Sequence, residues 1–224
     1  MSFHTRRSIA SASFVVVMMC AFWSAGCGRK KTDDDKSPAP ASVQQSARAS
    51  VQQSVPEPLP EPIVKAWTEA GATTGWFRQI SPGNVMFLQK LKPLKAGDVP
   101  VFAFHSLPEG ILAKLPPPQQ PFGLQLGSEG AEVTDASLKG LGRLEHLHTL
   151  YLEGSKVTDA GLKELAGLKE LQRLSLSERV TDAGLKELTA LKGLQSLRLD
   201  FSPKVTDAGV QELQKALPSC KIIK

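Results

Sequence analysis

Val157-Thr-Asp-Ala-Gly-Leu162 recurs, almost unchanged, through the second half of the chain, and this stretch decides the fold. The copies begin at Val133, Val157, Val180 and Val205, so successive starts lie 24, 23 and 25 residues apart. A unit of this length cannot bury its own apolar face, and neighbouring units must stack to build a continuous core. The sequence therefore predicts a repeat solenoid.

Leucines recur at fixed positions inside each repeat. The pattern Leu144-x-x-Leu147-x-x-Leu150-x-Leu152 returns in two further repeats that begin at Leu168 and Leu191. The closing Leu-x-Leu pair alternates, which predicts a short strand with both leucines directed inward. In each Val-Thr-Asp stretch the Thr predicts a helix cap, and the Asp favours the positive helix end. Residues 122–126 and 220–222 predict a first and a last strand, which makes about five parallel strands.

These residues resemble the leucine-rich-repeat family, in the helix-containing form of ribonuclease inhibitor and of F-box ubiquitin-ligase receptors, which includes the cysteine-containing subtype. The Val-Thr-Asp-Ala-Gly-Leu wording is most similar to repeats expanded in some environmental bacteria. The resemblance covers residues 122–224 and implies an α/β solenoid, a right-handed β-α superhelix, that binds a ligand without catalysis. The usual Asn after Leu-x-Leu is replaced by Ser155 and Ser202, with Ser177 in the repeat between them. We therefore expect Ser or backbone groups to supply the turn hydrogen bonds.

The outward residues of these strands form the concave face in that family. Our alignment places Tyr151, Arg173 and Arg198 at equivalent positions of successive strands, flanked by Glu153 and Asp200. Tyr and Arg are the residue types that most often anchor interfaces. We therefore expect this row to bind a protein or peptide, and the alternative is an ordinary solvated polar face.

The first 26 residues have the pattern of an export signal. An arginine pair, Arg6 and Arg7, precedes an apolar run over residues 9–21, and small residues follow at 24–26. The Cys27 that comes next resembles the modified cysteine of a bacterial lipobox, which implies a lipid-anchored envelope protein. Ser24 stands where that motif usually has an aliphatic residue, so a cleaved ordinary signal and an uncleaved anchor remain alternatives.

Two segments separate this signal from the repeats. Residues 27–62 are rich in Ser, Gln, Pro and Ala, which predicts a disordered tether. Residues 63–121 have the composition of folded protein, with a helix predicted at 63–70 and a strand at 99–104. We expect this segment to cap the first repeat, because a solenoid must cover its terminal apolar face. The alternative is a small independent domain with its own ligand.

Charge, cysteines and motifs exclude several function classes. From residue 122 onward there are 14 basic and 14 acidic residues, so the repeats offer no basic stripe for a nucleic acid. The three cysteines show no paired spacing for zinc or a disulfide framework. No hydrolase, phosphate-loop or zinc-protease motif is present, so we expect no cofactor, metal or catalysis.

The sequence thus favours non-catalytic protein or peptide binding by an envelope-tethered repeat domain. One alternative is a structural lipoprotein that spaces or coats a surface without a specific ligand. A more distant alternative is an enzyme whose active site lies in residues 63–121.

Overall fold

The structure, a computed structural model, describes residues 56–81, 84–89, 94–127 and 132–224. These residues belong to one compact unit, which spans residues 49–224. The predicted export signal, Cys27 and most of the predicted tether lie outside the described residues. The first helix, α1 (Glu61–Glu69), begins inside the range predicted as tether. Pro62 at its start explains this, because proline lacks the backbone donor that the first helical turn leaves unpaired.

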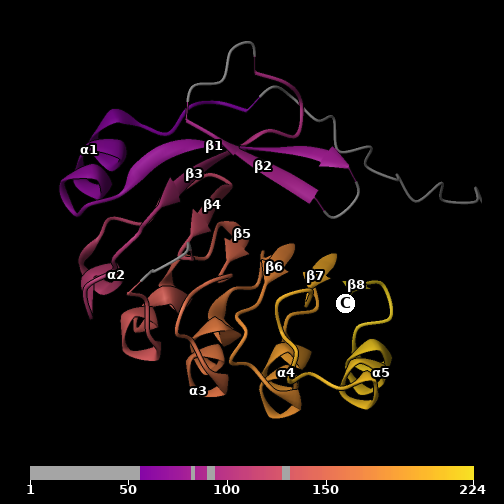
Figure 1. The fold of residues 1–224 in the computed structure, drawn as a ribbon. Coiled ribbons are helices and arrows are strands. Elements are labelled where there is room, and N and C mark those ends of the chain that lie inside the picture. The colour runs from indigo at the N-terminus through magenta and orange to yellow at the C-terminus, as the bar shows by residue number, and fades with distance from the viewer. Residues whose placement is uncertain (1–55, 82–83, 90–93, 128–131) are drawn as a thin grey trace, which may run out of the picture. The chain divides into compact units, whose positions relative to one another are not determined.

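One eight-stranded sheet organises the described residues, in the order β2-β1-β3-β4-β5-β6-β7-β8 (Figure 1). Its strands are β1 (Thr73–Ser81), β2 (Asn84–Leu88), β3 (Val99–Ala103), β4 (Phe122–Gln125), β5 (Leu147–Tyr151), β6 (Arg173–Ser175), β7 (Ser196–Arg198) and β8 (Lys221–Ile223). Strands β3 to β8 pair in parallel, whereas β1 pairs antiparallel with both β2 and β3. The five predicted parallel strands are β4 to β8, and β3 extends them by one.

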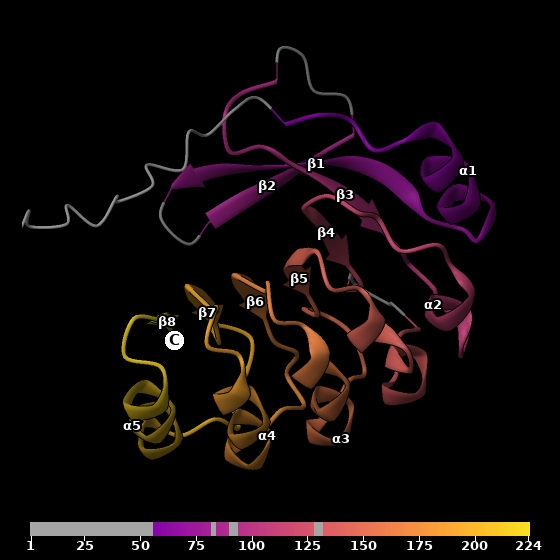
Figure 2. The same ribbon diagram turned by 180° about the vertical axis from the view of Figure 1, so that it is seen from behind.

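Short helical segments line the other side of the repeat strands (Figure 2). They are α2 (Ile111–Lys114), η1 (Asp135–Leu138), η2 (Leu141–Arg143), α3 (Asp159–Leu162), η3 (Lys163–Gly167), α4 (Asp182–Glu187), η4 (Leu188–Ala190) and α5 (Asp207–Ala216). With the curled parallel sheet they form a leucine-rich-repeat-like solenoid.

The leucines of the repeats form the core between sheet and helices. Leu150 pairs with Leu174, and Leu174 with Leu197, on adjacent strands. All three are at most 2% exposed, so the predicted inward direction is confirmed. This ladder sets the sheet register, because a one-residue slip would turn every leucine to the opposite face.

The Val-Thr-Asp stretch does more than cap helices. The predicted caps are confirmed at Thr158, Thr181 and Thr206, whose hydroxyls accept from backbone N–H groups. The Asp of each Val-Thr-Asp copy also binds the Thr of the next copy and so joins two repeats. Asp159 accepts from the backbone N of Thr181 at 2.8 Å and from its Oγ1 at 2.7 Å. The same pair of bonds links Asp135 to Thr158 and Asp182 to Thr206.

Serines carry the turn hydrogen bonds, as the missing asparagines predict. Ser177 Oγ donates to the carbonyl of Val157 at 2.5 Å, and Ser202 Oγ donates to that of Ser177 at 2.9 Å. Ser155 Oγ donates within its own turn, to Leu152 O at 2.6 Å. All three serines are buried, so these bonds satisfy hydroxyls that water does not reach.

An aromatic cluster joins the segment before residue 122 to the repeats. Trp67 of α1 stacks on Phe102 with ring centroids 4.4 Å apart and meets Phe122 of β4 edge-on at 5.9 Å. Its indole N–H donates to Pro116 O at 2.9 Å. The predicted helix and the predicted strand are confirmed by α1 and β3, and their side chains continue the leucine core.

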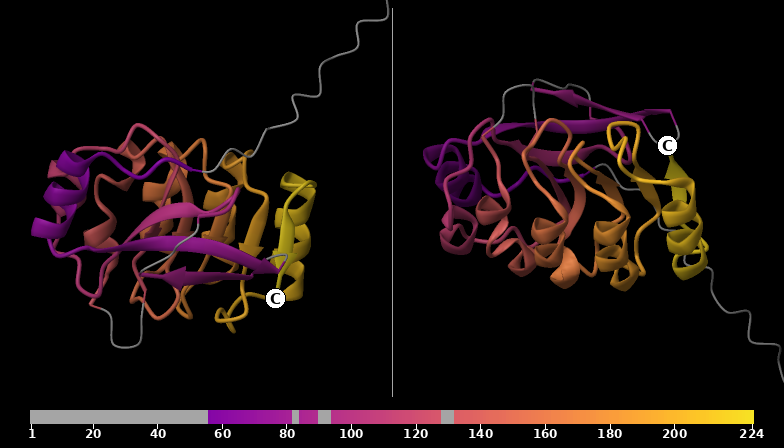
Figure 3. Two further views of the ribbon diagram at one scale, coloured as in Figure 1. Left: turned by 90° about the horizontal axis from the view of Figure 1, so that it is seen from above. Right: turned by 60° about the horizontal axis from the view of Figure 1, so that its bottom comes forward.

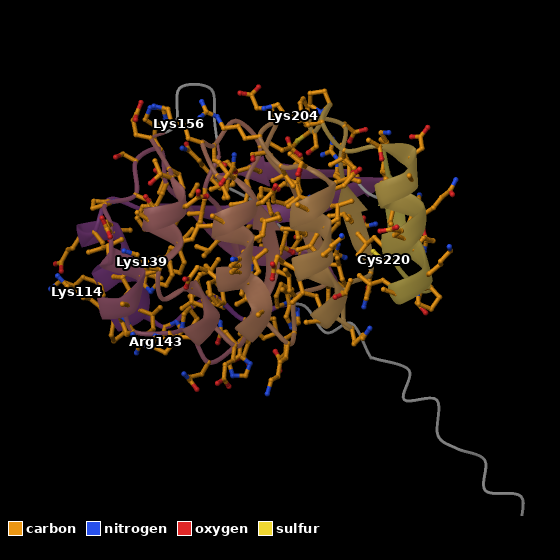
Figure 4. All side chains as sticks on the ribbon, turned by 90° about the horizontal axis from the view of Figure 1, so that it is seen from below. Lys114, Lys139, Arg143, Lys156, Lys204 and Cys220 are labelled. Atoms are coloured by element: carbon orange, nitrogen blue, oxygen red, sulfur yellow. The ribbon has the colours of Figure 1, made fainter. Side chains whose placement is uncertain are left out.

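Polar contacts strengthen this junction on the helical side. Lys139 of the first repeat pairs with Glu109 at 2.6 Å, and Arg143 donates to the carbonyl of Ala113 in α2. Figure 4 shows Lys139 and Arg143 beside Lys114 at one end of the helical face, with Cys220 at the other end. The first repeat is therefore covered both in the core and at its surface.

Candidate binding cleft

The antiparallel hairpin formed by β1 and β2, named here the roof hairpin, crosses the concave face of the repeat sheet (Figure 3). The sequence interpretation missed it. Pro82-Gly83 between two runs rich in aromatic and β-branched residues was the available signal, because such a pair marks a turn. The face expected to be open is therefore partly covered by the chain itself.

Phe77 in β1 anchors the roof hairpin on the repeats. Its ring meets Tyr151 of β5 edge-on, with centroids 4.9 Å apart, and meets Phe87 of β2 at 6.1 Å. Gly123 on β4 makes room for this contact, since a Cβ there would lie 2.9 Å from the Phe77 ring. Burial raises the pKa of Tyr151 to about 12, because the phenolate loses hydration. Tyr151 is thus largely covered by its contact with the roof hairpin.

The observed register corrects the predicted row of Tyr151, Arg173 and Arg198. Tyr151 pairs with Ser175, and Ser175 pairs with Arg198. Arg173 pairs instead with Thr149, two residues earlier along β5. The reason is the leucine ladder: Tyr151 and Arg198 follow the ladder leucine of their strands, whereas Arg173 precedes it. Arg173 therefore lies in a separate row, and its Nη2 donates to Oε1 of Gln79 in the roof hairpin at 3.2 Å.

The predicted flanking carboxylates do come together, around Arg198. Arg198 Nη1 lies 3.4 Å from Glu153 Oε1, and its Nε donates to Asp200 Oδ2 at 3.1 Å. Ser175 Oγ also donates to Glu153. The Arg198 guanidinium lies 6.0 Å from the ring centroid of Phe201, which is 50% exposed. This group presents one cation, two carboxylates and an exposed aromatic ring.

A cleft of about 140 Å³ lies between the roof hairpin and the repeats. Aromatic rings from both sides and the Arg198 group line it, and its residues are Phe77, Phe87, Gln125, Gly127, Tyr151, Glu153 and Arg198. Among the described residues, Gln125 Oε1 and the Thr149 hydroxyl are buried polar atoms without a hydrogen-bond partner. Of these two residues, Gln125 lines the cleft.

Other candidate groups are occupied by structural contacts. His146 Nδ1 and His148 Nε2 approach the same carboxylate oxygen of Glu170, at 3.1 and 3.4 Å. The pKa of His148 is lowered, chiefly by burial. Cys220 is buried, which raises its thiol pKa to about 11 and disfavours the thiolate. Within the described residues no group of three or more His, Cys, Asp or Glu side chains could hold a metal ion.

None of the described helices has the length and apolar composition needed to cross a membrane.

Comparisons with known proteins find likeness among solved structures. Neither a protein-family model nor a curated protein matches the chain. A solved structure of a leucine-rich-repeat protein from Leptospira interrogans is similar at 30% identity and a TM-score of 0.36. The similarity covers 48% of this chain and 26% of that one. The fold assignment rests on this chain's own repeats and hydrogen bonds.

Proposed function

We propose that this chain is a non-catalytic binding protein that takes an extended segment of a partner protein or peptide into the cleft. The supporting observation is the path from the cleft to Phe201. Arg198 lines the cleft and also lies over the ring of Phe201, so the aromatic lining continues onto the open end of the concave face. Exposed aromatic rings beside Arg are typical binding anchors.

Polar groups along this path suit a peptide backbone. Glu153 and Asp200 accept hydrogen bonds, and Arg198 donates them. A flexible ligand would find apolar contact at Phe77 and Tyr151 and polar contact beyond them. Mixed lining of this kind is usual for sites that fix orientation with a few polar groups.

The test is selection of ligands from a random-peptide library on the full chain. We expect an enriched peptide family whose affinity falls about tenfold for Phe201→Ala and for Arg198→Ala. Lys163→Ala on the helical side is the matched control and keeps full affinity. An absence of enriched peptides, or peptides that bind all three variants equally, would refute a binding role for the cleft and favour a spacing role.

The envelope location is a further part of the proposal and rests on sequence alone. Residues 1–26 would direct export, Cys27 would carry the lipid, and the residues between Cys27 and the folded part would hold that part away from the membrane. More than one acyl chain makes such an anchor stable, since each buried methylene adds about 0.8 kcal/mol. Mass spectrometry of the mature N-terminus in a bacterial host tests it, and a free thiol on Cys27 would contradict it.

A further inference from the structure

A second pocket lies where the roof hairpin meets Arg173. We name it the side pocket; it has a volume of about 310 Å³ and is lined chiefly by Arg78, Gln79, Lys95, Gly97, Asp98 and Arg173. The pocket and the cleft lie at opposite ends of the repeat strands, because Arg173 begins β6 whereas Tyr151 ends β5. A ligand that occupies both must run along the repeat strands past the contact between Phe77 and Tyr151.

Three cations and one carboxylate line the side pocket, and the carboxylate is already engaged. Arg78 donates to Asp98 through Nε at 2.9 Å and through Nη2 at 2.7 Å. The backbone N of Lys95 donates to the same carboxylate at 2.8 Å. Asp98 is 4% exposed, so these bonds hold a buried charge that its immediate partners compensate. Arg78 is thus the main partner of Asp98, Lys95 adds a weaker attraction through space, and among the described residues Asp98 forms no ion pair with Arg173.

Lys95 and Arg173 supply the remaining positive charge. Arg173 donates to the neutral amide oxygen of Gln79, and within the described residues neither Lys95 nor Arg173 forms an ion pair. A carboxylate here would replace a neutral acceptor with a charged one, and charge-assisted bonds are about twice as strong.

We propose that the side pocket binds a carboxylate of the peptide that occupies the cleft, held between Lys95 and Arg173. The inference deepens the proposed function and depends on it: the preferred ligand is an acidic peptide. The carboxylate has two possible sources, an Asp or Glu side chain and a peptide C-terminus. Arg78 contributes by fixing Asp98 and the turn that carries Lys95, and Gln79 directs Arg173 toward the pocket.

The test uses three defined probes on the full chain, read by fluorescence anisotropy with an uncharged dye. They are an oligoglutamate with both ends blocked, the matching blocked oligoglutamine, and the oligoglutamine with a free C-terminal carboxylate. We expect oligoglutamate to bind and blocked oligoglutamine not to bind. Binding of the third probe as tightly as oligoglutamate would assign the pocket to a peptide C-terminus.

Variants locate the binding. Lys95→Gln and Arg173→Gln each lower oligoglutamate affinity about tenfold. The double variant Lys163→Gln with Lys186→Gln removes two charges from the helical side and is the control, with unchanged affinity. Failure of both oligoglutamate and the free-carboxylate oligoglutamine to bind, or equal binding of these probes to all variants, overturns the proposal. Library peptides that still require Phe201 and Arg198 would then show that the cleft binds peptides without the side pocket.

Discussion

The rings of Phe77 and Tyr151 meet edge-on, 4.9 Å between centroids, and join the roof hairpin to the fifth strand of the sheet. This contact converts the open face of a short solenoid into a roofed cleft. The part of that face that the hairpin leaves uncovered lies near Arg198 and Phe201. The proposed binding function requires that the roof hairpin stays in this place.

The Asp–Thr bonds between repeats make a prediction with an internal control. Asp159→Ala removes two hydrogen bonds and leaves the N–H and hydroxyl of Thr181 without their acceptor. We expect the free energy of unfolding to fall by about 1–3 kcal/mol in chemical denaturation.

Asp207→Ala is the matched control, because Asp207 occupies the same motif position at the last helix. Asp207 is exposed and paired with Lys224, and it stands at the end of the series of Asp–Thr bonds. Its loss removes the same helix-end charge but no inter-repeat bond, so the expected change is within about 0.5 kcal/mol. An equal loss of unfolding free energy in the two variants would show that the Asp–Thr bonds between repeats contribute little to stability.

The Gly that follows Val-Thr-Asp-Ala is explained by its close approach to the Asp of the previous repeat. A Cβ at Gly184 would lie 2.3 Å from Asp159 Oδ1. We expect Gly184→Ala to cost about 1–3 kcal/mol of unfolding free energy, because the carboxylate must leave its place against Thr181.

In the background of Asp159→Ala the cost of Gly184→Ala should largely disappear. The expected coupling in a double-mutant cycle is therefore about 1 kcal/mol or more. The first repeat agrees with this explanation, because no Val-Thr-Asp copy precedes it and it carries Ser137 at the position of the Gly. Simple additivity of the two substitutions would contradict the steric explanation.

The Arg78–Asp98 pair predicts an acid dependence. The bonds from Arg78 hold the pKa of Asp98 below its ordinary value of 3.8. A lowered pKa means that the folded state binds the proton less tightly than the unfolded state. The contribution of the Asp98 charge to the stability of the fold is therefore fully present above the pKa of the unfolded state. It is lost as pH falls through the lower pKa of the folded state.

Asp98→Asn tests this dependence by thermal or chemical unfolding at several pH values. At neutral pH we expect a loss of about 1.5–3 kcal/mol. The difference from the wild type should stay constant down to about pH 5 and shrink below about pH 4. A difference that does not change with pH would mean that the pair does not stabilise the fold through its charge.

The repeats were predictable because their leucines obey a strict spacing. The strands over residues 122–126 and 220–222 follow from that spacing, as does the replacement of Asn by Ser. The same alignment, read residue by residue, would have placed Ser175 rather than Arg173 in the row of Tyr151. That error arose from choosing a residue type over the register of the ladder leucines.

The roof hairpin is harder to predict, because its place depends on contacts between distant segments. Phe77 meets Tyr151 because β3 pairs in parallel with β4 and β1 pairs antiparallel with β3. The role of Asp159 is hidden for a similar reason. Its Thr partner belongs to the next repeat, and a helix-end charge explains the same residue equally well from sequence.

Titration of Tyr151 tests the roofed cleft most directly. The chain contains one tyrosine, so the phenolate absorbance reports this residue alone. We predict a pKa of about 12 in the wild type and, in Phe77→Ala, a pKa nearer the ordinary 10.0, since the phenol is then hydrated. A wild-type tyrosine that titrates near 10, or a value that Phe77→Ala leaves unchanged, would show that the roof hairpin does not cover the concave face.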